Sequence, residues 1–203
     1  MNELVRTTID SLRKNGMEAD YFENAGEAVK ALLEEIGSAD SVGIGGSVTV
    51  SSLEIPRLLL ERGNKVYFHW LENTPEKMDE ARTNAARADV YLTSTNALTA
   101  KGQLVNTDGT GNRVASMIYG PRKVIVICGV NKLVEDLDGA FLRVKKAAYK
   151  NAKRLKLNTP CAINEACSDC SSPQRICSVT TIIEKKPGKT GMKVYIIGEE
   201  LGF

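Results

Sequence analysis

Hydrophobic and polar residues follow two different periods along the chain, and segments of the two kinds alternate. Apolar residues recur at helical spacing in residues 2–15 and 25–36, whereas 123–128 (KVIVIC) is a continuous apolar run typical of a buried strand. Further helices are predicted at 49–62 with a break near Pro56, at 75–88, after Asn112 and at 137–155. Further strands are predicted at 18–22, 65–70, 89–93, near Leu104, at 180–184 and at 193–197, and 41–47 is predicted as a short strand that runs into a glycine turn. This alternation predicts an α/β fold with a Rossmann-like, mostly parallel sheet flanked by helices.

Polar turns follow three of the predicted strands, at 43–49, 93–97 and 129–132. In open parallel sheets, ligands bind beyond the carboxyl ends of the strands, so we expect a pocket there, with the loop 106–113 folded over it. The predicted ligand-binding residues are Gly45, Gly46, Ser47, Thr49, Asn96, Gly109, Gly111, Asn112 and Arg113, and the candidate catalytic residues are Asp108 and Lys132.

The chemistry of these residues favours an anionic ligand. Glycines in GIGGS (43–47) let backbone N–H groups approach an anion, although Val48 at the third glycine position excludes a dinucleotide fingerprint. Arg113 is suited to a carboxylate or phosphate, and Lys132 is a candidate ligand cation. Each feature also has an interpretation without a ligand. GIGGS could be a plain strand-to-helix turn, Arg113 could form a surface ion pair, and Lys132 could be a solvated lysine.

Four of the five cysteines lie in one short loop, at Cys161, Cys167, Cys170 and Cys177, with the spacing C-x5-C-x2-C-x6-C. Sulfur-only ligation from one loop favours an iron–sulfur cluster of the 4Fe-4S type. A structural zinc on four thiolates is the alternative cofactor, and disulfides or free thiols are the third interpretation. Cys128, isolated at a strand end, is predicted to belong to the core.

Composition narrows the class of protein. A length of 203 residues with 42% apolar residues suits one domain with a substantial core. A net charge of +2 argues against nucleic acid as a partner. No segment has the length of a membrane span, and the N-terminal residues lack the apolar region of a signal peptide, so we expect a cytoplasmic protein. His69, the single histidine, is predicted to be half-buried on a strand.

Residues 91–134 (YLTSTNALTAKGQLVNTDGTGNRVASMIYGPRKVIVICGVNKLV), with the cysteine loop and the closing GEELG at 198–202, resemble the LUD (lactate-utilisation) domain family. The likeness is to its short branch with a cysteine-rich tail. The resemblance implies the fold shared by ribose-5-phosphate isomerase and CoA transferases, and a role in lactate or related organic-acid metabolism. It divides the chain into an α/β LUD-like part, 1–158, and a cysteine-rich loop with closing strands of the same domain, 159–203.

A second likeness argues against one enzymatic activity, that of a sugar-phosphate isomerase. STNALTAKGQLVNTDGT (94–110) is similar to a sugar-phosphate isomerase pattern whose catalytic aspartate falls on Asn96. An amide cannot accept a proton as a carboxylate does, so isomerase chemistry is disfavoured while ligand binding is retained. No glutamate nucleophile for CoA transfer is found in the matching loops.

Two functions from different classes follow. The first is an iron–sulfur-binding redox component of organic-acid metabolism, with a pocket for a small organic acid or phosphorylated metabolite and with iron–sulfur or flavin redox proteins as partners. The alternative is a non-redox enzyme or a ligand-binding regulator with a structural zinc. The sequence does not decide whether the chain is catalytic, and a homodimer is only one of the oligomeric states it allows.

Overall fold

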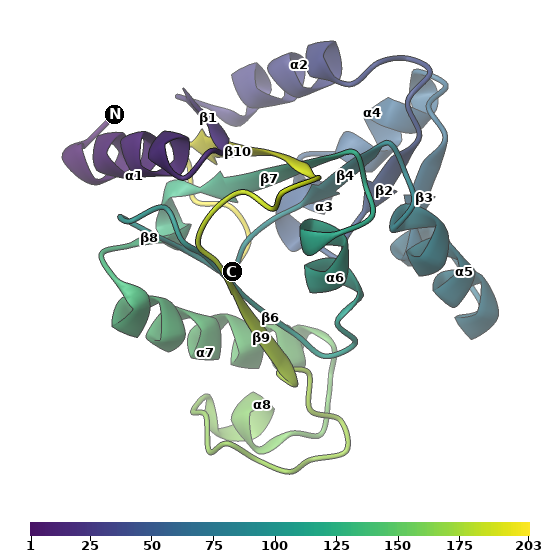
Figure 1. Ribbon diagram of the computed structural model, residues 1–203. Helices are drawn as coiled ribbons and strands as arrows, with labels where there is room; N and C mark the ends of the chain where they lie inside the picture. The colour runs from purple at the N-terminus through teal and green to yellow at the C-terminus, as the bar shows by residue number, and fades with distance from the viewer.

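Six parallel strands form the central sheet, sheet A, in the computed structural model, which describes residues 1–203 (Figure 1). Every neighbouring pair in this sheet is parallel. The strand order is β1 (Glu18–Phe22), β10 (Gly191–Ile197), β7 (Lys123–Gly129), β4 (Val90–Thr93), β2 (Val42–Ile44) and β3 (Val66–Phe68). The Rossmann-like fold class predicted from the alternation of strands and helices is therefore confirmed.

The central strand β7 is buried on both faces and divides the hydrophobic core into two layers. Val124 and Val126 point into one layer, whereas Ile125 and Ile127 point into the other, as the two-residue period of a strand requires. Cys128 is fully buried in the first layer, which agrees with its predicted place in the core. This strand carries the residues that follow it, including Lys132, to the carboxyl edge of the sheet.

Helices cover both faces of sheet A. On one face lie α2 (Ala25–Glu35), α3 (Val48–Ser52) and α4 (Ile55–Glu61), and on the other lie α1 (Glu3–Lys14), α5 (Pro75–Ala85) and α6 (Asn112–Ile118). The predicted break near Pro56 separates α3 from α4, where Glu54 takes a left-handed conformation and Pro56 lies in the first turn of the new helix. None of the helices combines the length and the apolarity needed to cross a membrane.

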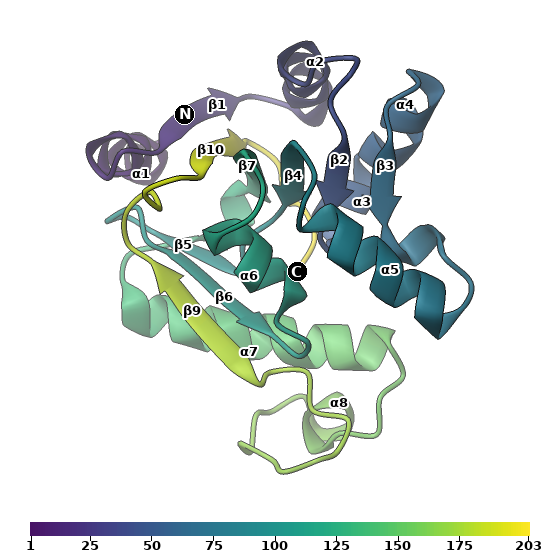
Figure 2. The same ribbon diagram turned by 45° about the vertical axis from the view of Figure 1, so that its right-hand side comes forward.

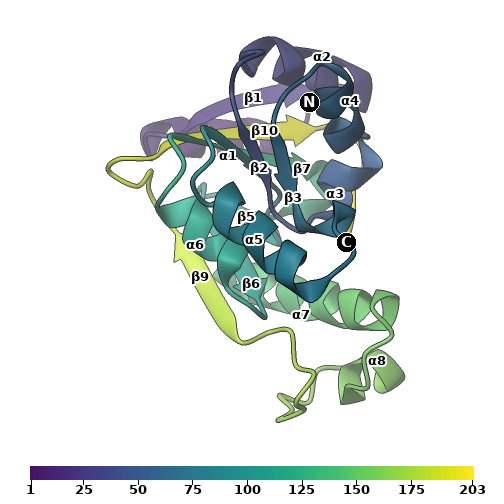
Figure 3. The same ribbon diagram turned by 90° about the vertical axis from the view of Figure 1, so that its right-hand side faces the viewer.

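A second, mixed sheet, sheet B, packs below sheet A (Figure 2). Its order is β8 (Leu133–Val134), β5 (Ala97–Thr99), β6 (Leu104–Asp108) and β9 (Val179–Ile183). The long helix α7 (Leu137–Arg154) covers its outer face, and α8 (Pro160–Asn164) lies beyond α7 on the side away from sheet A (Figure 3). Short 3-10 turns, η1 (His69–Leu71) and η2 (Val130–Lys132), follow β3 and β7.

Two details differ from the sequence-based expectation. The two closing strands, which the sequence places on either side of one turn, belong to different sheets: β9 joins sheet B and β10 joins sheet A. His69 lies on η1 and not on a strand, since β3 ends at Phe68. The half-burial predicted for this histidine is nevertheless found, and its new position turns it toward the carboxyl edge of sheet A.

Candidate functional site

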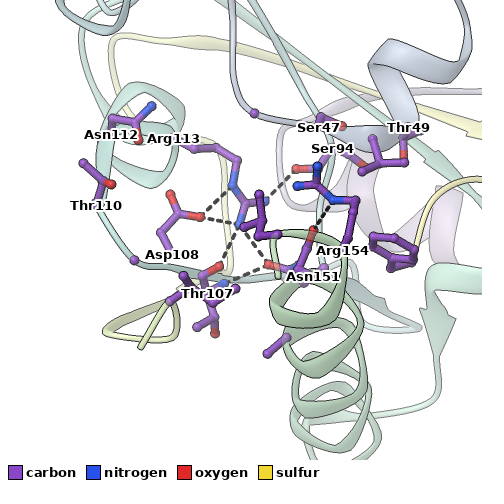
Figure 4. A pocket seen from close by; sticks show the side chains of 18 of the residues that line it. Ser47, Thr49, Ser94, Thr107, Asp108, Thr110, Asn112, Arg113, Asn151 and Arg154 are labelled. Carbon is purple, nitrogen blue, oxygen red and sulfur yellow. Dashed lines mark hydrogen bonds and ion pairs between the residues drawn. The ribbon is translucent and has the colours of Figure 1, made fainter. Parts of the chain in front are cut away.

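A pocket of about 390 Å³ opens at the carboxyl edge of sheet A, between the two sheets and the end of α7 (Figure 4). The turns after β2, β4 and β7 and the loop after β6 all contribute to its lining. Of the predicted site residues, those that line it are Gly46, Ser47, Thr49, Asn96, Asp108, Gly109, Asn112, Arg113 and Lys132. Residues that the sequence separates by more than eighty positions thus meet in one cavity.

Lys132 is a buried amine within this pocket and has only neutral hydrogen-bond partners. Its side chain is 4% exposed, and Nζ donates to the hydroxyl oxygens of Thr49 and Ser94, each at 2.8 Å. No carboxylate forms a salt bridge with it. Burial, with the nearby guanidiniums of Arg143 and Arg113, lowers the pKa of Lys132 from 10.5 to about 7. The amine can therefore take up or release a proton near neutral pH.

The guanidinium of Arg113 uses its N–H donors in hydrogen bonds within the protein. Its guanidinium donates to the Asp108 carboxylate at 2.6 and 2.8 Å, to the side-chain oxygens of Asn96 and Asn106, and to the backbone carbonyls of Ser94 and Thr107. The second oxygen of Asp108 accepts from the backbone N–H of Val114 at 3.1 Å. These bonds tie the pocket loops together, so the Asp108–Arg113 pair is built as a structural connection.

Asn96 belongs to the same connection. Its side-chain oxygen accepts from Arg113 at 2.9 Å and from the backbone N–H of Thr107 at 2.9 Å. Asn106, which no sequence motif indicates, is fully buried, and its oxygen accepts from Arg113 and from the backbone N–H of Asn96. The amide at position 96 therefore joins sheet B to the turn after β4.

Two predicted ligand-binding glycines lie outside the pocket lining. A Cβ on Gly45 would lie 2.9 Å from the Tyr91 hydroxyl, so glycine is needed there for packing. Gly111 has a φ of +87° and precedes α6, a backbone conformation that glycine adopts without strain. Ser47 caps α3 by accepting from the backbone N–H of Val50 at 3.2 Å.

Comparison with known sequences decides the family. The sequence profile of the LUD domain matches residues 5–197, nearly the whole chain. The chain belongs to the LUD domain family. Its fold is similar to the crystal structure of a DUF162 family protein from Deinococcus radiodurans, with a TM-score of 0.57 and 17% identity over 97% of each chain. Among curated proteins, none matches this sequence.

The cysteine-rich part of this LUD domain begins at α8 and ends beside the pocket. Cys161 lies on α8, and all four loop cysteines are free thiols that are at least partly exposed. At its far end, Ile176 lines the pocket, and Ser178 donates its backbone N–H to the carbonyl of Asp108 at 2.9 Å. The loop is therefore anchored directly on the pocket wall.

The four thiols interact electrostatically. Burial raises the pKa of the Cys177 thiol, Arg175 opposes the rise, and the other three loop cysteines add to it. Arg175 also donates to the backbone carbonyls of Cys170 and Cys177, at 2.7 and 3.0 Å. No group of three or more potential metal ligands is preassembled in the structure. The donor set, four neighbouring free thiols, fits a thiolate-ligated metal or cluster, and this ligation stays a prediction.

The pocket of the LUD domain also has a wall that the sequence did not indicate. Trp70 and His69 come from η1, Arg82 comes from α5 and Arg154 comes from the end of α7. Burial and the neighbouring Arg82 lower the pKa of His69 to about 4, so this imidazole is neutral at physiological pH. The only sequence signal for Arg154 is the basic face of residues 143–156, which is typical of a solvated helix face.

Proposed function

We propose that this LUD domain binds a small organic acid in the pocket, with the ligand carboxylate placed at Lys132. The observation that supports the proposal is a buried amine that forms no salt bridge with any carboxylate. A buried ammonium group is costly unless an anion accompanies it, and here only two hydroxyl groups do. A bound carboxylate would supply that charge, and the hydroxyls of Thr49 and Ser94 would keep the amine in place.

We further propose that Cys161, Cys167, Cys170 and Cys177 hold an iron–sulfur cluster, which when bound would supply one-electron transfer. The attachment of the cysteine loop to Asp108 and its contribution of Ile176 to the pocket support a link between the two sites. The chain would then act as a redox component of lactate or related organic-acid metabolism. In that role, its own residues would bind the acid, keep its carboxylate oriented and exchange a proton at Lys132.

Two measurements test this function. Protein isolated without oxygen should contain iron and sulfide in matching amounts, and lactate or glycerate should bind with calorimetrically detectable heat. Lys132→Met should abolish acid binding, whereas Lys150→Met, an exposed position on α7, should leave it unchanged. Binding by the Lys132→Met protein equal to that of the parent would remove the basis of the acid site.

A non-redox enzyme with a structural zinc is the second candidate, and one observation favours it. An amine with a pKa of about 7 is suited to general acid–base catalysis, which requires no redox group. One zinc per chain with no iron, together with turnover of an acid that is lost in Lys132→Met, would select this function. Acid binding without turnover would instead indicate a regulatory module.

A further inference from the structure

Two arginines on the outer wall of the pocket have no buried acidic partner. Arg154 donates from Nε to the side-chain oxygen of Asn151 at 3.2 Å, and it forms no salt bridge. Arg82 pairs only with Asp79, at 3.8 Å, and Asp79 is a mostly exposed residue. Arg113, by contrast, has all its N–H groups directed at protein acceptors. The two outer guanidiniums are therefore the ones with donors left for a ligand.

Trp70 holds one of these guanidiniums in position. The centre of the Arg154 guanidinium lies 5.1 Å from the Trp70 ring, in a cation–π contact that stabilises the cation without using its N–H donors. Figure 4 shows the Arg154 side chain reaching from α7 into the pocket. Asp108 is the only acidic side chain in the pocket lining, and it is paired with Arg113, so it does not neutralise Arg82 or Arg154.

The size of the pocket bears on what it binds. A cavity of about 390 Å³ falls in the range of roughly 300–1,000 Å³ that accommodates drug-sized ligands. A three-carbon acid bound at Lys132 would fill only part of that volume, and Arg82 and Arg154 belong to the same lining. A longer ligand with a second anionic group would fill it.

We propose that the natural ligand is a phosphorylated small acid whose phosphate binds between Arg82 and Arg154 while its carboxylate lies at Lys132. Guanidinium groups bind phosphate oxygens with paired N–H donors, which a compact ammonium cannot do. The inference rests on the proposed acid site at Lys132 and adds the chemical class of the ligand. Trp70 and Arg154 then form one unit, with the indole presenting the guanidinium to the phosphate.

Glycerate and 3-phosphoglycerate are a matched pair of probes, since they differ only in the phosphate. Calorimetry should show 3-phosphoglycerate binding at least about tenfold more tightly than glycerate, the effect expected of one charge-assisted contact. Trp70 is the single tryptophan of the chain, so its fluorescence should change on titration with 3-phosphoglycerate and much less with glycerate. Inorganic phosphate alone should bind more weakly than 3-phosphoglycerate.

Variants separate this inference from the acid site on which it rests. Arg154→Gln and Arg82→Gln should bring the affinity for 3-phosphoglycerate close to that for glycerate, so each should weaken 3-phosphoglycerate binding much more than glycerate binding. Lys150→Gln, an exposed change on the same helix as Arg154, should retain the preference. Equal binding of the two probes by the parent protein, or inorganic phosphate binding as tightly as 3-phosphoglycerate, overturns this inference alone. Failure of both probes to bind overturns the acid site as well.

Discussion

The amine of Lys132 lies 2.8 Å from the hydroxyl oxygen of Ser94, although the two residues follow different strands of sheet A and are 38 positions apart. The contact exists because β4 and β7 are parallel neighbours, so the residues after both strands emerge at the same edge. Thr49, from the turn after β2, completes the arrangement. Three separate segments are thus required to enclose one amine, and this enclosure sets its pKa.

Acid binding should depend on pH through Lys132. The amine is charged below a pKa of about 7 and becomes neutral above it, whereas a carboxylate ligand stays charged throughout this range. Affinity for lactate or glycerate should therefore be constant from pH 5.5 to 6.5 and fall by about tenfold per unit above pH 7. Titration calorimetry across this range measures the effect. An affinity that rises with pH would contradict the assignment.

The free energy of unfolding should also depend on pH through Lys132, but it should rise with pH where the affinity for the acid falls. The folded-state pKa of Lys132 is about 7 and the unfolded value is about 10.5, so the unfolded chain binds more protons between these limits. This contribution destabilises the fold at pH 7 and below, and the penalty is removed as pH rises from 7 to 10.5. The parent should gain about 4 kcal/mol relative to Lys132→Met over this range, as urea unfolding at several pH values would show.

Breaking the Asp108–Arg113 pair should destabilise the protein strongly. Arg113→Gln leaves a carboxylate with little exposure and without its partner, which costs about 3–5 kcal/mol. The matched control is Arg57→Gln, which removes exposed ion pairs to Glu54 and Glu61 and should cost less than about 1 kcal/mol. Denaturant unfolding compares the two variants. Equal losses would mean that the buried pair has no special structural role.

Packing explains Gly45 without reference to a ligand. In Gly45→Ala the new methyl group would lie 2.9 Å from the Tyr91 hydroxyl, so the fold should lose about 1–3 kcal/mol. Gly188→Ala, where the methyl group meets nothing within 4 Å, should be close to neutral. Thermal unfolding of both variants provides the comparison, and a neutral Gly45→Ala would leave the glycine free for a binding role.

Iron content should depend on the loop cysteines and not on Cys128. Cys167→Ser and Cys170→Ser should each lower the iron and sulfide recovered from protein isolated without oxygen, because each removes a thiolate ligand of the proposed cluster. Cys128→Ala should retain both, since Cys128 is fully buried in the core. Retention of iron in the two loop variants would exclude the assigned ligands.

Local patterns predicted the elements of the fold well. The strand at 18–22 and the break at Pro56 depend on neighbouring residues, which a sequence displays directly. The separation of β9 and β10 into different sheets depends on which distant strand each one pairs with. Side-chain alternation in a strand cannot identify its partner, so the sequence does not show that these two adjacent strands belong to different sheets.

The sequence predicted one part of the candidate site and not another. Lys132 could be located because it follows the most apolar strand of the chain. Trp70, Arg82 and Arg154 could not, because their proximity results from packing among η1, α5 and the end of α7. Arg113 was predicted as a ligand-binding residue, yet its donors are directed at protein acceptors that lie close to it only in the folded chain.

The most direct test of the acid site is titration calorimetry of lactate and glycerate, at pH 6, against the parent, Lys132→Met and Lys150→Met proteins. The account predicts binding of at least one acid by the parent and by Lys150→Met, and loss of that binding in Lys132→Met while the variant remains folded. Binding retained by folded Lys132→Met protein, or no binding of either acid by the parent, would contradict the account.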